Sequence, residues 1–101
     1  MYRHGDLLIV PCENRPEDAK RLDHVVLAEG EVTGHHHRIA DPATAALYEA
    51  SDGTLYIDVV AAQASLVHEE HAEIVLPTGV YEVVRQREFD PFEDAVRNVA
   101  D

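Results

Sequence analysis

The sequence predicts an all-β fold, organised as a small single-domain β-barrel or sandwich. Short runs rich in valine, isoleucine and leucine recur along the chain, with turn-forming residues between them. One segment alternates apolar and polar residues directly after an Asp-Gly pair, which is the pattern of a β-hairpin. The 101 residues suffice for one modest core, so we expect residues 1–101 to form a single domain.

The N-terminal half contains two regions with strand character. Residues 6–12, DLLIVPC, are mostly apolar, and Pro11 favours an edge strand or a strand end because proline lacks an amide hydrogen. The polar residues 13–22 predict a loop or a short helical turn. Residues 24–39, HVVLAEGEVTGHHHRI, contain two glycines that either divide the segment into two strands or bend one long strand through bulges.

The C-terminal half contains the clearest element. Residues 45–60, AALYEASDGTLYIDVV, predict a hairpin that turns at Asp52-Gly53. Residues 64–90 predict two further strands, with a tight turn at Pro77-Thr78-Gly79 between them. Apolar residues recur at helical spacing in the tail, so residues 89–101 form either a short helix or an ordered tail. The expected total is six to eight strands.

Charge and cysteine content limit the partners that we expect. The chain has 20 acidic and eight basic residues, and its formal net charge of -12 disfavours nucleic acid and attracts cations. The single cysteine, Cys12, allows no intrachain disulfide, which fits a reducing compartment. The first apolar run is too short for a signal sequence or a membrane span. These features predict a cytoplasmic protein without a nucleic-acid or membrane partner.

Three consecutive histidines, His35, His36 and His37, lie inside the chain in the stretch TGHHHRI. Their internal position between apolar segments distinguishes them from a terminal expression tag. Residues i and i+2 of a strand face the same side of a sheet. We therefore expect His35 and His37 to project together as two metal ligands, and His36 to point the other way.

A second histidine pair, His68 and His71, encloses two glutamates in the stretch HEEH. Residues i and i+3 of a regular strand face opposite sides, so this pair converges only if Glu69-Glu70 forms a turn or a bulge. Strand-forming residues on both sides of HEEH favour such a break. Zinc takes about four ligands and accepts imidazole nitrogen. The two pairs thus predict a divalent metal site for zinc, with iron, nickel and manganese as alternatives.

Glu69 and Glu70 are the candidate catalytic residues because they lie between two candidate ligands. A carboxylate in such a place serves as a general base or fixes the tautomer of a ligand histidine. Zinc with an open position lowers the pKa of bound water toward 7 and generates hydroxide for attack on a carbonyl, phosphoryl or carbon dioxide-like centre. The alternative for both glutamates is a solvated turn.

The other candidate ligands have simpler interpretations. We interpret His4 and His24 as surface histidines or as partly buried residues with satisfied hydrogen bonds. Cys12 is interpreted as a small buried apolar residue rather than a ligand.

The stretch GEVTGHHHRI, with His35 and His37, and the later Pro77-Thr78-Gly79 turn resemble motifs of the cupin family of small β-barrels. The resemblance covers roughly residues 30–85 and implies a barrel with a histidine-ligated metal. Glu49 takes the place of the family's acidic ligand, at a longer spacing. The family's last histidine normally follows the Pro-x-Gly turn, where this chain has Glu82. The resemblance implies no particular substrate.

Three functions remain open from the sequence. The first is a zinc-type hydrolase or hydratase, a lyase, that acts on a small-molecule substrate through metal-activated water. The second is a non-catalytic metal-binding or regulatory module, in which the ion stabilises a homo-oligomer. The third is a metal-free interaction domain that adds a partner's strand to an edge of its own sheet.

Overall fold

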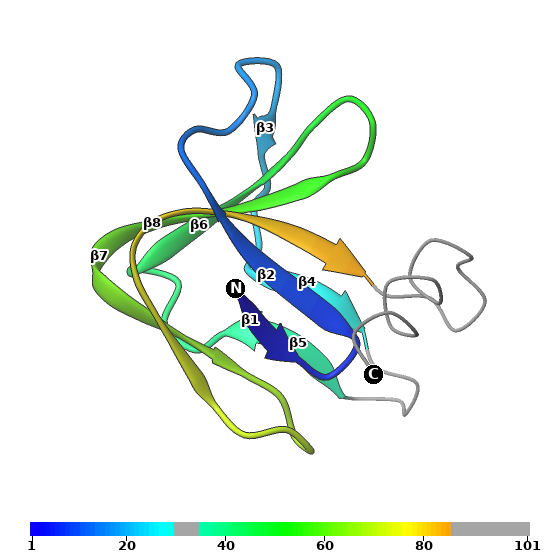
Figure 1. The fold of residues 1–101 in the computed structure, drawn as a ribbon, viewed down its shortest axis with the longest axis vertical. Coiled ribbons are helices and arrows are strands. Elements are labelled where there is room, and N and C mark those ends of the chain that lie inside the picture. The colour runs from blue at the N-terminus through cyan, green and yellow to red at the C-terminus, as the bar shows by residue number, and fades with distance from the viewer. Residues whose placement is uncertain (30–34, 86–101) are drawn as a thin grey trace.

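The fold of the chain is given by a computed structural model, which describes residues 1–29 and 35–85. Within these ranges the chain forms eight β-strands and no helix, which confirms the all-β prediction (Figure 1). The predicted tail element at residues 89–101 lies outside the described ranges. The strands are β1 (Tyr2–His4), β2 (Leu7–Cys12), β3 (Lys20–Arg21), β4 (Val26–Glu29), β5 (His36–Ile39), β6 (Ala45–Glu49), β7 (Leu55–Val67) and β8 (Ile74–Arg85).

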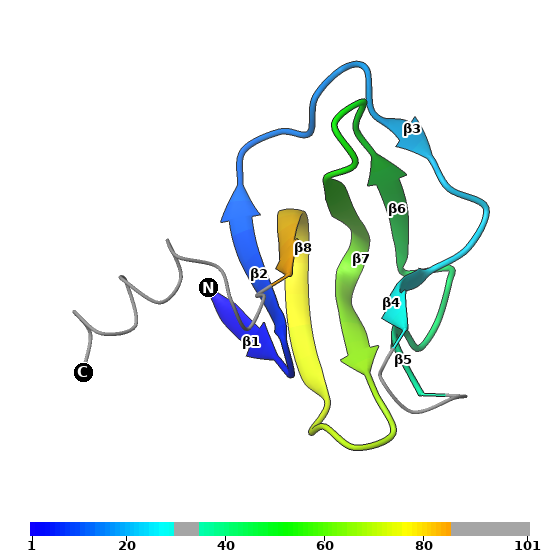
Figure 2. The same ribbon diagram turned by 90° about the vertical axis from the view of Figure 1, so that its right-hand side faces the viewer.

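The eight strands belong to one antiparallel sheet. Its hydrogen-bonded order is β1-β2-β8-β7-β5-β4, and β6 pairs with both β7 and β3. The first part of β7 pairs with β6 and its last part pairs with β5, because β7 is thirteen residues long. Figure 2 shows β2, β8, β7 and β6 side by side. Within the described residues the sheet is not closed into a barrel, because β1 and β4 stand at opposite ends of the order, which corrects the barrel alternative. The sandwich alternative fits.

No part of residues 1–29 or 35–85 forms a helix long and apolar enough to cross a membrane.

Alternating side chains place the core on one face of the strands. In β7, Ile57 and Val59 are buried, whereas Tyr56 and Asp58, which alternate with them, are only half-buried. β2 follows the same alternation, with Leu7 and Ile9 buried. The core joins buried side chains from both halves of the chain: Leu7, Ile9, Leu27, Ile39, Ala45, Leu47, Ile57, Val59, Ala64, Leu66, Leu76 and Tyr81.

The predicted β6–β7 hairpin is confirmed. Its strands pair from Ala45 opposite Val59 to Glu49 opposite Leu55. The connecting turn contains Gly53, whose φ of 89° is a conformation that favours glycine. The predicted division of residues 24–39 is resolved in favour of two strands, because β4 and β5 pair with each other as separate antiparallel strands.

The predicted tight turn at Pro77-Thr78-Gly79 is wrong, because these residues continue β8. Pro77 lies opposite Gln63 and Gly79 lies opposite Val59, so three residues of β7 face one residue of β8. Proline and a glycine with φ of 149° suit such a bulge, where regular pairing is interrupted. The chain instead reverses between the end of β7 and the start of β8, at residues 68–73, which contain HEEH.

Two neighbouring valines test which face of β7 is buried. Val59 is 1% exposed and Val60 is 65% exposed. We expect Val59→Ala to lower the free energy of unfolding by about 2 kcal/mol, because it removes buried apolar groups and leaves a cavity. Val60→Ala is the matched control, with an expected loss under about 0.5 kcal/mol. Urea denaturation measures both, and a larger loss for Val60→Ala would contradict the assigned face.

Candidate metal centre

Four histidine side chains from three distant segments meet at one place in the structure. His4 ends β1, His37 lies in β5, and His68 and His71 lie in the β7–β8 connection. The ring centroids of His37 and His68 are 4.5 Å apart, and those of His68 and His71 are 4.6 Å apart. The ring of His4 lies 5.0 Å from that of His37 and 5.8 Å from that of His71. We call these four residues the histidine cluster.

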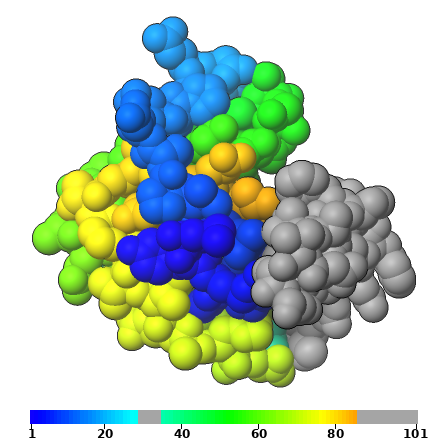
Figure 3. Space-filling model, viewed as in Figure 1, coloured from blue at the N-terminus to red at the C-terminus, as the bar shows by residue number. Residues whose placement is uncertain are grey.

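The cluster lies where the sheet is open. β1 is one end of the hydrogen-bonded order and β5 is next to the other end, so no backbone pairing joins them. Their contact is made by side chains, with Nδ1 of His4 only 2.9 Å from Nδ1 of His37. Both histidines are 2% exposed. Figure 3 shows the first residues of the chain, in dark blue, against the yellow-green surface of the β7–β8 connection.

His68 and His71 converge because the chain turns between them at Glu69-Glu70. Residues 69–71 form bends after β7 ends at Val67. The amide of Glu70 donates a hydrogen bond to Nδ1 of His68 at 3.0 Å, which holds the ring over the turn. His68 is half-buried and His71 is exposed. The cluster therefore extends from the buried His37 to the solvent.

Two groups of side chains within the described residues have the donor types and spacing of a metal site. In the first, one ligand atom each from His37, His68 and His71 lies within 4.8 Å of the others. In the second, His35, His68 and Glu69 meet the same limit. His68 is common to both groups. The structure thus distributes the four histidines expected as ligands over two overlapping groups.

His37 has the electrostatic state that a metal ligand needs. Burial is the main cause that lowers the pKa of His37 to about 4, and the neighbouring His4 and His68 lower it further. Asp6 acts in the opposite direction, with Oδ1 3.3 Å from Nε2 of His37. The ring of His37 is therefore neutral at pH 7, and only a neutral imidazole has a lone pair for a metal.

The turn between β1 and β2 packs directly against the rings. Gly5 has φ of 63°, and a Cβ added there would lie 2.7 Å from Nε2 of His71 and 2.9 Å from Cε1 of His37. Next in the chain, Asp6 forms an ion pair with Arg85, with Oδ2 3.0 Å from Nε. A side chain at position 5 has no room, so glycine allows the close approach of β1 to the cluster.

Glu69, one of the two candidate catalytic residues, is held by other groups. Its Oε1 accepts a hydrogen bond from Arg38 at 2.7 Å, and its Oε2 accepts one from the His36 amide at 2.9 Å. Its own backbone amide and that of His36 are the main causes that lower the pKa of Glu69 to about 2, and Arg38 adds to the effect. Glu69 is therefore a carboxylate that joins the β7–β8 turn to β5.

Glu70, the other candidate catalytic residue, lies closer to His35. Its Oε1 is 3.5 Å from Nδ1 of His35, and its side chain is 60% exposed. His35 precedes β5 and its ring centroid lies 5.7 Å from that of His68. Glu70 is thus the candidate whose carboxylate is less occupied by hydrogen bonds within the described residues.

The remaining sequence candidates lie outside the cluster. His36 precedes the buried His37 in β5 and belongs to neither group of potential ligands within the described residues. Glu49, the counterpart of the cupin acidic ligand, is exposed at the end of β6 and also belongs to neither group. Cys12 is half-buried, and burial followed by the charge of Glu82 raises its pKa. His24 is exposed, in line with a surface histidine.

Sequence reasoning missed His4 and its neighbours Gly5 and Asp6. The sequence predicts that His4 is a surface residue or a partly buried one with satisfied hydrogen bonds, but His4 is a buried member of the cluster with Nε2 unpartnered among the described residues. His4 and His37 are 33 residues apart in the sequence. Local sequence patterns do not indicate side-chain contacts between two strands that are not paired with each other. The only local signal is the glycine after His4, which permits a tight turn.

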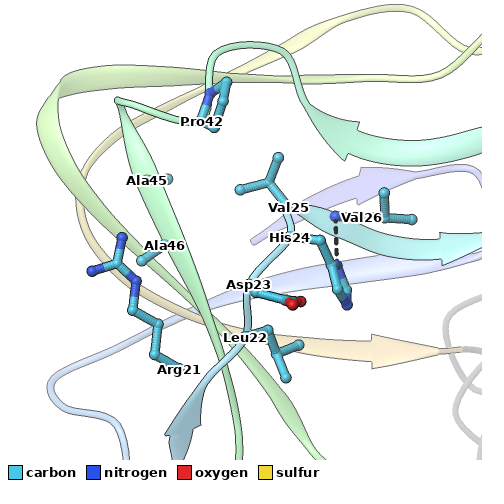
Figure 4. Close-up of a pocket in the computed structure, with 9 residues that line it drawn as sticks. All are labelled: Arg21, Leu22, Asp23, His24, Val25, Val26, Pro42, Ala45 and Ala46. Carbon is cyan, nitrogen blue, oxygen red and sulfur yellow. Dashed lines mark hydrogen bonds between the residues drawn. The ribbon is translucent and has the colours of Figure 1, made fainter.

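A separate pocket of about 430 Å³ lies away from the cluster. It is lined by residues 21–26, together with Pro42, Ala45 and Ala46, and its only histidine is His24. Figure 4 shows the ring of His24 turned toward the start of β4, where its Nδ1 accepts a hydrogen bond from the Val26 amide. No member of the histidine cluster lines this pocket, so it offers no binding space for a substrate at the candidate metal centre.

Comparison with known proteins identifies one family. The family profile described as a domain of unknown function, DUF8820, matches residues 3–86, a range that includes all four members of the cluster. No curated protein and no solved structure matches the chain.

Two glycines at positive φ test how closely the β1–β2 turn packs on the rings. Gly5→Ala places a Cβ against His71 and His37, whereas a Cβ at Gly53 meets nothing within 4 Å. We expect Gly53→Ala to cost about 1 kcal/mol of backbone strain, and Gly5→Ala to cost at least about 1 kcal/mol more through overpacking. Urea denaturation in the presence of a chelator measures both. Equal losses would contradict the contact between Gly5 and the rings.

Proposed function

The chain belongs to the DUF8820 family, and we propose that it binds a divalent transition metal, zinc first, through His37, His68 and His71. The observation that carries this proposal is the convergence of His68 and His71, from the β7–β8 connection, on the buried ring of His37 in β5. Their ligand atoms lie within 4.8 Å of one another. Zinc with bonds of about 2.0–2.1 Å holds its ligand atoms about 3.4 Å apart, so binding requires the rings to close by an ångström or so.

The closure is feasible because two of the ligands lie in a connection rather than in a strand. His68 and His71 flank the bends at residues 69–71, and His71 is exposed. Zinc binding to His68 would break the hydrogen bond that the Glu70 amide donates to Nδ1. Zinc on Nδ1 would replace that bond directly. Zinc on Nε2 would move the ring proton to Nδ1, which could then no longer accept the bond. Such a bond is worth about 1 kcal/mol, whereas structural zinc contributes on the order of 10 kcal/mol.

The donor set supports zinc over hard cations. Imidazole nitrogen suits zinc, iron, nickel and copper, whereas calcium and magnesium require oxygen donors. The nearest carboxylates, Asp6 and Glu69, are engaged by Arg85 and Arg38. The ion also joins β5 to the β7–β8 connection, which supports a stabilising role for the metal.

Zinc binding is tested by metal analysis and titration calorimetry on the untagged full chain. We expect about one zinc ion per chain in the wild type and a large loss of affinity in His37→Ala, His68→Ala and His71→Ala. His24→Ala is the control, because His24 is an exposed histidine outside the cluster. Loss of binding in His35→Ala with retention in His37→Ala would favour the second group. A wild type that binds no divalent metal would refute the proposal and favour a metal-free interaction domain.

A second candidate function is hydrolysis or hydration by metal-bound water. It is favoured by a site with three histidine ligands that reaches the solvent at His71, because such a site leaves a coordination position for water. Glu70 is the better candidate for a general base than Glu69, whose two oxygens accept hydrogen bonds from Arg38 and the His36 amide. The ion when bound supplies a hydroxide nucleophile near neutral pH.

Catalysis is tested with an activated ester and with carbon dioxide hydration. For this second function we expect the zinc-loaded protein to accelerate one of these reactions, with a rate that rises as pH passes through about 7. Glu70→Gln is expected to lower the rate by about 10²-fold or more, and Glu69→Gln by less. The His37→Ala variant with the same zinc concentration measures catalysis by free zinc. A wild-type rate equal to this background would leave metal binding as the function.

A further inference from the structure

His4 is a buried histidine that the three-ligand site does not use. Its side chain is 2% exposed, and its Nδ1 lies 2.9 Å from Nδ1 of His37, within hydrogen-bond distance. Its other nitrogen, Nε2, is buried and has no hydrogen-bond partner among the described residues. A buried polar group left without a partner destabilises the fold. The position of His4 therefore calls for a role that uses both ring nitrogens.

The His4–His37 hydrogen bond restricts where the protons lie. A neutral imidazole carries one proton, so one of the two facing Nδ1 atoms donates and the other accepts. If His4 donates, the proton of His37 is on Nε2, opposite the Asp6 carboxylate at 3.3 Å, and neither nitrogen of His37 is available to a metal. If His37 donates, its Nε2 has a free lone pair next to that carboxylate. Only the second arrangement lets His37 bind a cation.

We propose that His4 is the positioning residue of the metal centre: its Nδ1 accepts the proton of His37 Nδ1 and so presents His37 Nε2 to the ion. This inference rests on the proposed metal binding. Ligand histidines usually donate their second ring N–H to an acceptor that fixes the tautomer, and here the acceptor is another imidazole. Asp6, held by Arg85, places a negative charge beside the nitrogen that faces the cation.

Metal binding then moves protons within the His4–His37 pair, and the total number of protons on the two rings stays the same. Nε2 of His37 loses its proton, Nδ1 of His37 takes the shared one, and Nε2 of His4 gains one. Because Nδ1 of His4 accepts the hydrogen bond from His37 in this arrangement, Nε2 of His4 is the nitrogen of the pair that receives the displaced proton.

The tautomers are measured by two-bond ¹H–¹⁵N correlation spectra of the imidazole rings in the labelled full chain. Spectra are recorded with equimolar zinc and with a chelator. We expect zinc-loaded protein to contain His37 protonated at Nδ1 and His4 protonated at Nε2, and the chelated protein to contain His4 protonated at Nδ1. Zinc-loaded His37 that is protonated at Nε2 would overturn the inference.

Two variants at position 4 separate proton acceptance from packing. His4→Phe keeps a ring of similar size without nitrogen, and we expect about a 10–100-fold loss of zinc affinity by calorimetry. His4→Asn retains an acceptor oxygen near the position of Nδ1, and we expect it to recover most of that loss. Unchanged affinity in folded His4→Phe, or equal losses in both variants, would overturn the role of His4. Absence of zinc binding in the wild type would overturn both proposals, so the two failures are distinguishable.

Discussion

The antiparallel pairing of β7 with β8 is the constraint on which the rest of the structure depends. These strands are thirteen and twelve residues long, and the bulge opposite Pro77-Thr78-Gly79 divides their pairing into two parts. Beyond the bulge, β7 leaves β6 and pairs with β5, so the β7–β8 connection lies beside His37. On the other side of β8, β2 pairs with the part of that strand after the bulge, from Val80 to Arg85. Side-chain contact between His4 and His71 brings β1 to the same connection. The histidine cluster follows from this arrangement.

The open edge of the sheet gives the cluster its place in the fold. Backbone hydrogen bonds do not join β1 to β5, so the space between them is filled by side chains. Burying polar rings there is favourable only when their nitrogens find partners, and the His4–His37 hydrogen bond supplies one such pair. An ion at the proposed centre would supply further partners, so the proposed metal binding would also help to pack this edge of the sheet.

The sequence predicts the features of this fold that depend on residues close together in the chain. The alternation around Asp52-Gly53 correctly predicted a hairpin, because hairpins form between neighbouring residues. HEEH correctly predicted a break in strand structure. The turn predicted at Pro77-Thr78-Gly79 is wrong, because proline and glycine suit a bulge in a long strand as well as a turn. His4 could not be assigned, because its partner is fixed by the order of strands in the sheet, which no local pattern determines.

The two arginine–carboxylate pairs beside the cluster bear on which ions a strongly acidic protein admits. A net charge of -12 concentrates every cation near the surface, including the abundant magnesium and potassium ions. Arg85 binds Oδ2 of Asp6 and Arg38 binds Oε1 of Glu69, so each arginine takes one carboxylate oxygen of the kind that these hard ions prefer. At the proposed metal centre, imidazole nitrogens would then be the main donors, with Oδ1 of Asp6 beside Nε2 of His37. Ion selectivity at that centre would depend on the two arginines as well as on the histidines.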